Sequence, residues 1–173
     1  MSAGPRVLVA GVGNLFLGDD GFGPEVVRRL DLEATEEPTW SSSVRVIDYG
    51  IRGLHLAYDL LDGYDALVLV DTVPSRGTPG RLSVLEVTAE DLSGGEVDAH
   101  GMDPAAMLGN LGRLGGTLPR TVVVGCEPVT VEEGIGLSGP VEAAVGPAVD
   151  AVRTVVSALV AGATLLPLPA GAR

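Results

Sequence analysis

Short apolar runs that end in polar or glycine-rich stretches recur along the chain and predict β-strands. The five predicted strands are residues 6–10, 44–47, 66–70, 81–87 and 121–124. Residues 66–70 are apolar at every position, which is typical of a central strand in a parallel sheet covered on both faces. Residues 81–87 alternate imperfectly after a turn containing glycine and proline, and we expect them to form an edge strand.

Apolar residues at helical spacing separate these runs. Helices are predicted at residues 24–30, 54–61 and 103–111, and from near Ser138 to Leu159. The polar residues 31–43, including Trp40, are expected to form a solvated surface connection. Strands that alternate with helices predict one α/β domain across residues 1–173, a mostly parallel twisted sheet with helices on both faces. We expect its core at about residues 6–160 and a mobile tail at residues 161–173.

Composition and charge narrow the classes of function. The 173 residues include 11 basic and 23 acidic side chains, a net charge of −12, which disfavours nucleic acid and anionic membranes as partners. The single cysteine, Cys126, excludes a disulfide framework and a cysteine-based zinc site, so we expect a reducing, cytoplasmic setting. We see no signal peptide, and the most apolar segment, residues 154–168, is shorter than the ~20 residues of a membrane span.

Acidic residues follow the predicted strands, at the edge where open α/β sheets bind ligands. Asp20 ends the glycine-rich loop after the first strand, Asp48 follows the second, and Asp71 follows the third. His100 precedes a predicted helix. Two carboxylates and an imidazole suit a borderline divalent cation such as nickel or zinc.

Each of these residues also has a purely structural interpretation. Asp20 can cap the helix that begins at Pro24, and Asp71 can bond its own backbone in a turn. His100 can be a surface histidine or a buried one with satisfied hydrogen bonds. Structural roles are also expected for Asp103 as a helix N-cap, for His55 as a peripheral residue and for Cys126 as a small buried one.

The first loop departs from a dinucleotide-binding fingerprint. Phe16 stands where the third glycine or alanine would be, and Asp19 and Asp20 would face the pyrophosphate. No Gly-Lys-Ser/Thr sequence is present either. A nucleotide- or metabolite-binding protein is therefore the least favoured of the classes considered.

Five segments, taken in order, resemble the signatures of hydrogenase maturation proteases. The first is the strand followed by Gly11-Val-Gly-Asn14 and then Asp19-Asp20-Gly. The second is Asp71 after its apolar strand, with a later Pro-Gly turn, and the third is His100 before a helix. The last two are Glu127-Pro128 and residues 134–138. The resemblance covers residues 6–159.

The resemblance implies a function and a set of site residues. The family removes a C-terminal extension from a nickel-loaded hydrogenase large-subunit precursor, and Asp20, Asp71 and His100 match its metal-contacting residues. The nickel would belong to the substrate, with no permanent cofactor, although nickel, zinc or cadmium can occupy such a site. A loop containing Asp48, Gly50 and Gly53 would help to select the substrate. Its sequence departs from the Asp-Gly-Gly-Thr of many members, which leaves open which hydrogenase is served.

The mechanism has two open alternatives at this point. In the first, the nickel polarises the scissile carbonyl, and either the nickel or a carboxylate activates water. In the second, the metal site serves recognition alone, and Asp19 or Asp20 is the general base. A non-catalytic chaperone that binds metal or precursor is the alternative function. We expect a monomer whose partner is the large-subunit precursor.

Overall fold

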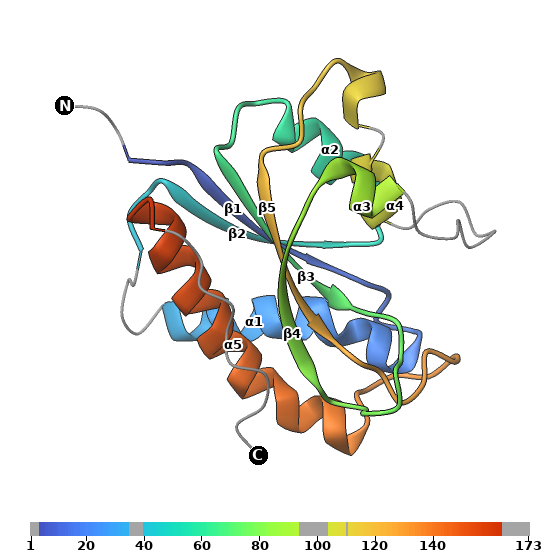
Figure 1. The fold of residues 1–173 in the computed structure, drawn as a ribbon. Coiled ribbons are helices and arrows are strands. Elements are labelled where there is room, and N and C mark those ends of the chain that lie inside the picture. Colours follow the sequence, from blue (N-terminus) through green and yellow to red (C-terminus); the bar gives the residue numbers. More distant parts are fainter. Residues whose placement is uncertain (1–3, 35–39, 94–103, 110, 164–173) are drawn as a thin grey trace.

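Five strands form one twisted sheet between two layers of helices (Figure 1). The computed structural model describes residues 4–34, 40–93, 104–109 and 111–163. The strands are β1 (Val7–Val12), β2 (Val44–Gly50), β3 (Ala66–Thr72), β4 (Leu82–Val87) and β5 (Arg120–Cys126), in the order β2-β1-β3-β5-β4. All neighbours are parallel except β4, which pairs antiparallel with β5 at an edge. The predictions of a mostly parallel sheet and an edge strand are confirmed.

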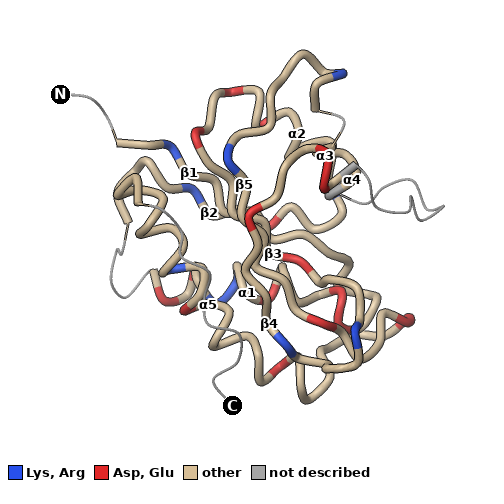
Figure 2. The backbone as a smooth tube through the Cα atoms, in the orientation of Figure 1, with Lys and Arg blue, Asp and Glu red and all other residues tan. Residues whose placement is uncertain are grey.

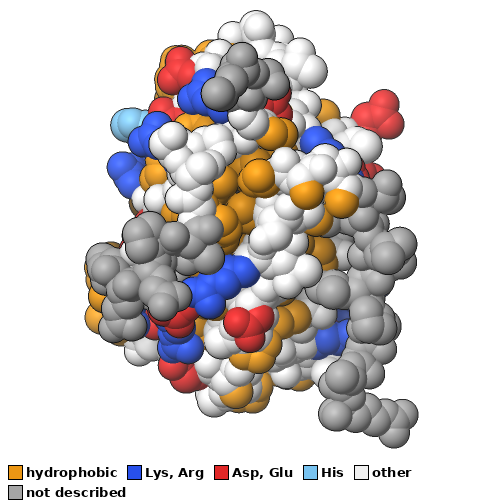
Figure 3. All heavy atoms as spheres, turned by 90° about the vertical axis from the view of Figure 1, so that its left-hand side faces the viewer, with side chains coloured by type: hydrophobic (Ala, Val, Ile, Leu, Met, Phe, Trp, Pro, Cys, Tyr) orange, Lys and Arg blue, Asp and Glu red, His pale blue; other side chains and the backbone are white. Residues whose placement is uncertain are grey.

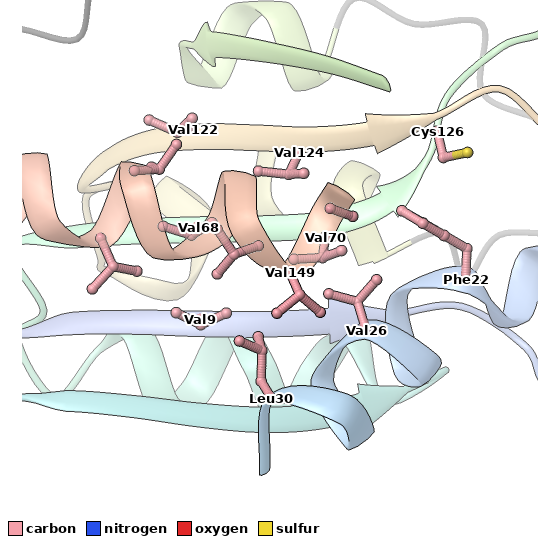
Figure 4. Close-up of a cluster of buried hydrophobic side chains, with 14 of the residues drawn as sticks. Val9, Phe22, Val26, Leu30, Val68, Val70, Val122, Val124, Cys126 and Val149 are labelled. Carbon is pink, nitrogen blue, oxygen red and sulfur yellow. The ribbon is translucent and has the colours of Figure 1, made fainter. Parts of the chain in front are cut away.

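Helices cover both faces of the sheet, as predicted. The helices are α1 (Phe22–Ala34), α2 (Gly53–Leu60), α3 (Ala89–Ser93), α4 (Pro104–Gly109) and α5 (Gly139–Val160), with 3-10 turns η1 (Gly18–Gly21) and η2 (Leu111–Leu114). One core lies between the sheet and α1 and α5, the other between the sheet and α2 and α4. Val68 and Val70 belong to the first core and Leu67 and Leu69 to the second, because successive strand residues point to opposite faces (Figure 4). This explains why β3 is apolar throughout.

The first helix is longer than predicted. It begins at Phe22, and its second residue, Gly23, packs directly against the strands: a Cβ there would lie 2.3 Å from the Val70 carbonyl oxygen and 2.4 Å from that of Val12. It continues through residues 31–34, where Glu33 pairs with Arg153 of α5. The prediction that residues 31–43 form a solvated connection is thus wrong for residues 31–34, and also for Trp40, which is partly buried against the core.

Helix α5 has the length and apolar composition of a membrane span, yet its buried face belongs to the core of the domain. Nine of its 22 residues are buried, and the helix packs against α1 and the sheet.

Hydrophobic side chains also reach the surface where β1 and β2 begin, as a patch bordered by charged side chains (Figure 3). Of the predicted tail, residues 164–173 lie outside the described residues.

Candidate functional site

The strand order reverses direction between β1 and β3. From β1 the chain crosses α1 to β2 on one side, and then returns through α2 to β3 on the other side of β1. In open α/β sheets, ligands bind at such a switch point, beyond the carboxyl ends of the two strands. The loop after β1 carries Asp20, and β3 ends at Asp71 and Thr72.

Asp20 is held by hydrogen bonds to both of its carboxylate oxygens. The Asn14 backbone N–H donates to Oδ2 at 2.8 Å, and the Thr72 hydroxyl donates to Oδ1 at 3.2 Å. Gly13 makes this fold-back possible, because its φ is 141° and an added Cβ would lie 1.8 Å from the Asp20 carbonyl oxygen. Asp20 is half-buried, and its carboxylate contacts the end of β3 through Thr72 rather than capping α1.

Asp71 lies at the end of β3 and is also half-buried. Its Oδ1 accepts the backbone N–H of Thr72 at 2.8 Å, which matches the structural interpretation of a strand-end acid. Thr72 faces Asp20, so Asp71 faces the other side of the sheet, the side covered by α2 and α4. Asp20 and Asp71 therefore reach the same end of two adjacent strands.

The third predicted ligand, His100, lies outside the described residues, as does Asp103. Within the described ranges, no group of three or more His, Cys, Asp or Glu side chains is placed to hold a metal. Asp20 and Asp71 lie at the same end of the sheet, and their joining with His100 in a metal site stays a prediction.

Asp19, the neighbour of Asp20, has a structural role. It is fully buried, and its oxygens accept the backbone N–H groups of Val129, Thr130 and Ser138 and the Ser138 hydroxyl, at 2.7 to 3.2 Å. Burial raises the pKa of Asp19, but the hydrogen bonds from Ser138, Val129 and Thr130 outweigh it, so the pKa is lowered overall. The suggestion that Asp19 is a general base is wrong, because its carboxylate is closed off from water and substrate.

The predicted substrate-selecting loop packs against the turn at Gly13. Asp48 ends the regular part of β2, where its Oδ1 accepts the Gly50 N–H at 2.8 Å. The Gly13 N–H donates to the Gly50 carbonyl at 2.9 Å, and Gly53 begins α2. Asp48 and Gly50 thus border the loop that carries Asp20.

A second buried acid orders the loop after Asp71. Glu127 is 5% exposed, and its carboxylate accepts the Arg76 N–H, while its backbone carbonyl accepts the Gly80 N–H at 2.8 Å. The adjacent Cys126 is buried, as predicted. His55 is exposed on α2, where it lines a surface pocket with Arg52, Leu54, Tyr58 and Asp59, and its predicted peripheral position is confirmed.

The residues that bind the paired aspartates were not predicted from the sequence, and among them are Asn14, Thr72 and Ser138. Asn14 stands in the loop motif and Thr72 directly follows Asp71, so their positions gave a weak signal. Ser138 was expected only at the start of the last helix. It is the N-cap residue of α5, but its hydroxyl donates to Asp19 instead of making a side-chain cap bond.

The sequence resembles known proteins over most of its length. The sequence model for hydrogenase maturation proteases matches residues 24–155. The hydrogenase 2 maturation protease of Escherichia coli K12 is 32% identical over 152 residues, covering 85% of this chain and 88% of that protein. Coenzyme F420 hydrogenase subunit delta of Methanothermobacter thermautotrophicus is 31% identical over 144 residues, covering 81% and 87%.

Solved structures show the same fold. The hydrogenase maturating endopeptidase HybD from Escherichia coli superposes with a TM-score of 0.72 at 27% identity, covering 88% of this chain and 92% of that one. A hydrogenase 2 maturation peptidase from a Thaumarchaeota archaeon has a TM-score of 0.64 at 33% identity, covering 87% and 97%. By sequence match and by fold, this chain belongs to the hydrogenase maturation protease family.

Proposed function

We propose that this chain is an endopeptidase that removes the C-terminal extension of a nickel-loaded large-subunit precursor of a nickel-iron hydrogenase. The observation that carries the proposal is the fixed orientation of Asp20 at the switch point, beside the β3 end that bears Asp71. This arrangement occurs in a chain of the maturation protease family. A chaperone that only binds the precursor would not need a carboxylate held in one orientation.

In this proposal the nickel arrives with the substrate, and the protein keeps no permanent metal. Asp20, Asp71 and His100 supply two carboxylates and an imidazole, which are suitable ligands for nickel and also for zinc or cadmium. Bound nickel polarises the scissile carbonyl group, and water is activated by the nickel or by Asp20. Asp48, Gly50 and Gly53 border the same loop and contribute to the choice of precursor.

The proposed setting is the cytoplasm, with the enzyme acting as a monomer on one precursor at a time. The net charge of −12 suits a protein partner better than nucleic acid or an anionic membrane.

The test mixes purified protein with nickel-loaded precursor and records the precursor mass before and after. Cleavage should remove the C-terminal extension, and nickel-free precursor should stay intact. Asp20→Asn, Asp71→Asn and His100→Ala should each stop cleavage, whereas Asp150→Asn on the exposed side of α5 should cleave at the wild-type rate. An unchanged precursor mass with tight binding would instead support the chaperone. Full activity of His100→Ala would refute the site assignment.

A further inference from the structure

Large apolar side chains point into solvent on two loops next to Asp20. Among the described residues, five of the twelve exposed large hydrophobic side chains lie there, with exposures from 49% to 83%. They are Leu15, Phe16, Val129, Val131 and Ile135, which we call the apolar rim. Single exposed apolar residues are ordinary, but a cluster on two paired loops indicates an interaction surface.

The two loops are joined by backbone hydrogen bonds. The Gly18 N–H donates to the Gly134 carbonyl at 2.9 Å, and the Gly134 N–H donates to the Phe16 carbonyl at 2.8 Å. The Asp19 N–H donates to the Thr130 carbonyl at 3.0 Å, and the buried Asp19 carboxylate binds the second loop again. The apolar rim is therefore held in place before any partner binds, which lowers the entropy lost on binding.

The apolar rim is continuous with the Asp20 site. Gly21, the residue after Asp20, lies between Leu15 and Leu137: a Cβ there would be 3.3 Å from Cδ2 of Leu15 and 3.8 Å from Cδ2 of Leu137. Leu15 also directly follows Asn14, whose N–H binds Asp20. A protein that binds the apolar rim would thus bring the adjoining part of its own polypeptide close to Asp20.

The charge of the rim restricts the partner. Glu132 and Glu133 are exposed between Val131 and Gly134, and Figure 2 shows several acidic positions at this end of the molecule, with basic positions on neighbouring segments. The sequence of the two loops, residues 14–20 and 128–138, contains acids and no Lys or Arg. A second copy would set Glu132 and Glu133 against like charges, so an apolar segment flanked by basic residues fits better.

We propose that the apolar rim is the docking surface for the hydrogenase large-subunit precursor, and that it binds an apolar, basic-flanked segment near the cleaved bond. This inference rests on the proposed function for the identity of the partner. The rim supplies binding and the Asp20 site supplies chemistry, so the two can be impaired separately.

The test compares the wild type with Phe16→Ser/Ile135→Ser, both exposed positions, and with Leu32→Ser as a matched control. Leu32 is 55% exposed on α1, ten residues beyond the start of that helix. Calorimetry with nickel-free precursor gives the Kd, and cleavage of nickel-loaded precursor gives KM and kcat. Thermal melting and size-exclusion chromatography check the fold and the oligomeric state of each variant.

In the Phe16→Ser/Ile135→Ser protein, Kd and KM should rise about tenfold or more, while kcat and the melting temperature should equal those of the wild type. Leu32→Ser should match the wild type in all of these values. If the wild type binds but never cleaves, the proposed function fails while the Kd values still decide the docking surface. Wild-type Kd and KM in the rim variant would overturn the docking surface alone. Two other results would also overturn the docking surface. One is a wild-type dimer that becomes a monomer in the rim variant, and the other is a wild-type protein that does not bind the precursor.

Discussion

The hydroxyl of Thr72 donates a hydrogen bond to Oδ1 of Asp20 over 3.2 Å. It joins the loop after β1 to the end of β3, one residue beyond Asp71. Because the Asn14 N–H binds the other oxygen, Asp20 is oriented from two sides. The contact therefore links the two aspartates through a residue that is not itself acidic.

Thr72→Val should slow cleavage of the precursor. It keeps the shape of the side chain but removes the donor to a charged acceptor, a bond that contributes about 1.5–3 kcal/mol, so kcat should fall about tenfold or more. Thr72→Ser keeps a hydroxyl and should retain most of the activity. Single-turnover cleavage followed by mass spectrometry measures both, and a Thr72→Val protein with wild-type kcat would contradict this role.

Asp19→Asn should destabilise the protein. The substitution places an amide NH2 among four donors in a buried site, so the free energy of unfolding should fall by about 3 kcal/mol. Urea unfolding at pH 7 measures the difference. The matched control is Asp62→Asn, an exposed acid, which should change stability little. Equal stability of Asp19→Asn and wild type would mean that the four bonds contribute nothing.

The same pair of proteins should differ in their pH dependence. The pKa of folded Asp19 lies below the usual value of an aspartate, so the charged form of Asp19 stabilises the fold above that usual value. This contribution is lost as the pH falls through the folded pKa. The gap in unfolding free energy between wild type and Asp19→Asn should therefore narrow on acidification below about pH 4. A gap that widens there would reverse the sign of the assigned shift.

Gly23→Ala should prevent normal folding. Its new Cβ would lie 2.3 Å and 2.4 Å from two backbone oxygens of the sheet, atoms that cannot move without shifting β1 or β3. Gly146→Ala is the control, because α5 leaves space there and alanine is the better helix former by about 1 kcal/mol. In thermal melting, the melting temperature should fall strongly for Gly23→Ala and should not fall for Gly146→Ala. A Gly23→Ala protein that melts like the wild type would contradict the close approach of α1.

The thiol of Cys126 should stay unreactive in the folded protein. Burial, together with the charges of Asp19 and Glu127, raises its pKa to about 12, and thiolate is the reactive form. Ellman's reagent at pH 8 should therefore give no colour until denaturant is added. Rapid labelling of the native protein would show that the end of β5 opens to solvent.

The periodicity of the sequence predicted most of the fold because the central strands β1, β3 and β5 are buried on both faces and the long helices bury one face. It predicted the start of α1 two residues late because Gly23 resembles a loop residue, whereas Gly23 is required by contact with the sheet. In the site, the sequence correctly predicted that Asp20 and Asp71 follow strands at one edge of the sheet, whereas their role as metal ligands stays a prediction. The burial of Asp19, in contrast to Asp20, was not predictable, because two adjacent acids look alike in the sequence. Only the contacts of Asp19 with residues 129–138, over 100 positions away, distinguish them.

Three of the four donors that bind Asp19 are backbone N–H groups. Such groups are present whatever side chains stand at those positions, so the outward-facing residues of the second loop can be exchanged without releasing it from its anchor. Surface substitution in this loop can thus change the proposed docking surface without altering Asp20 or the bonds that hold it. For the same reason, this loop is the natural place to begin when retargeting the enzyme to a different precursor.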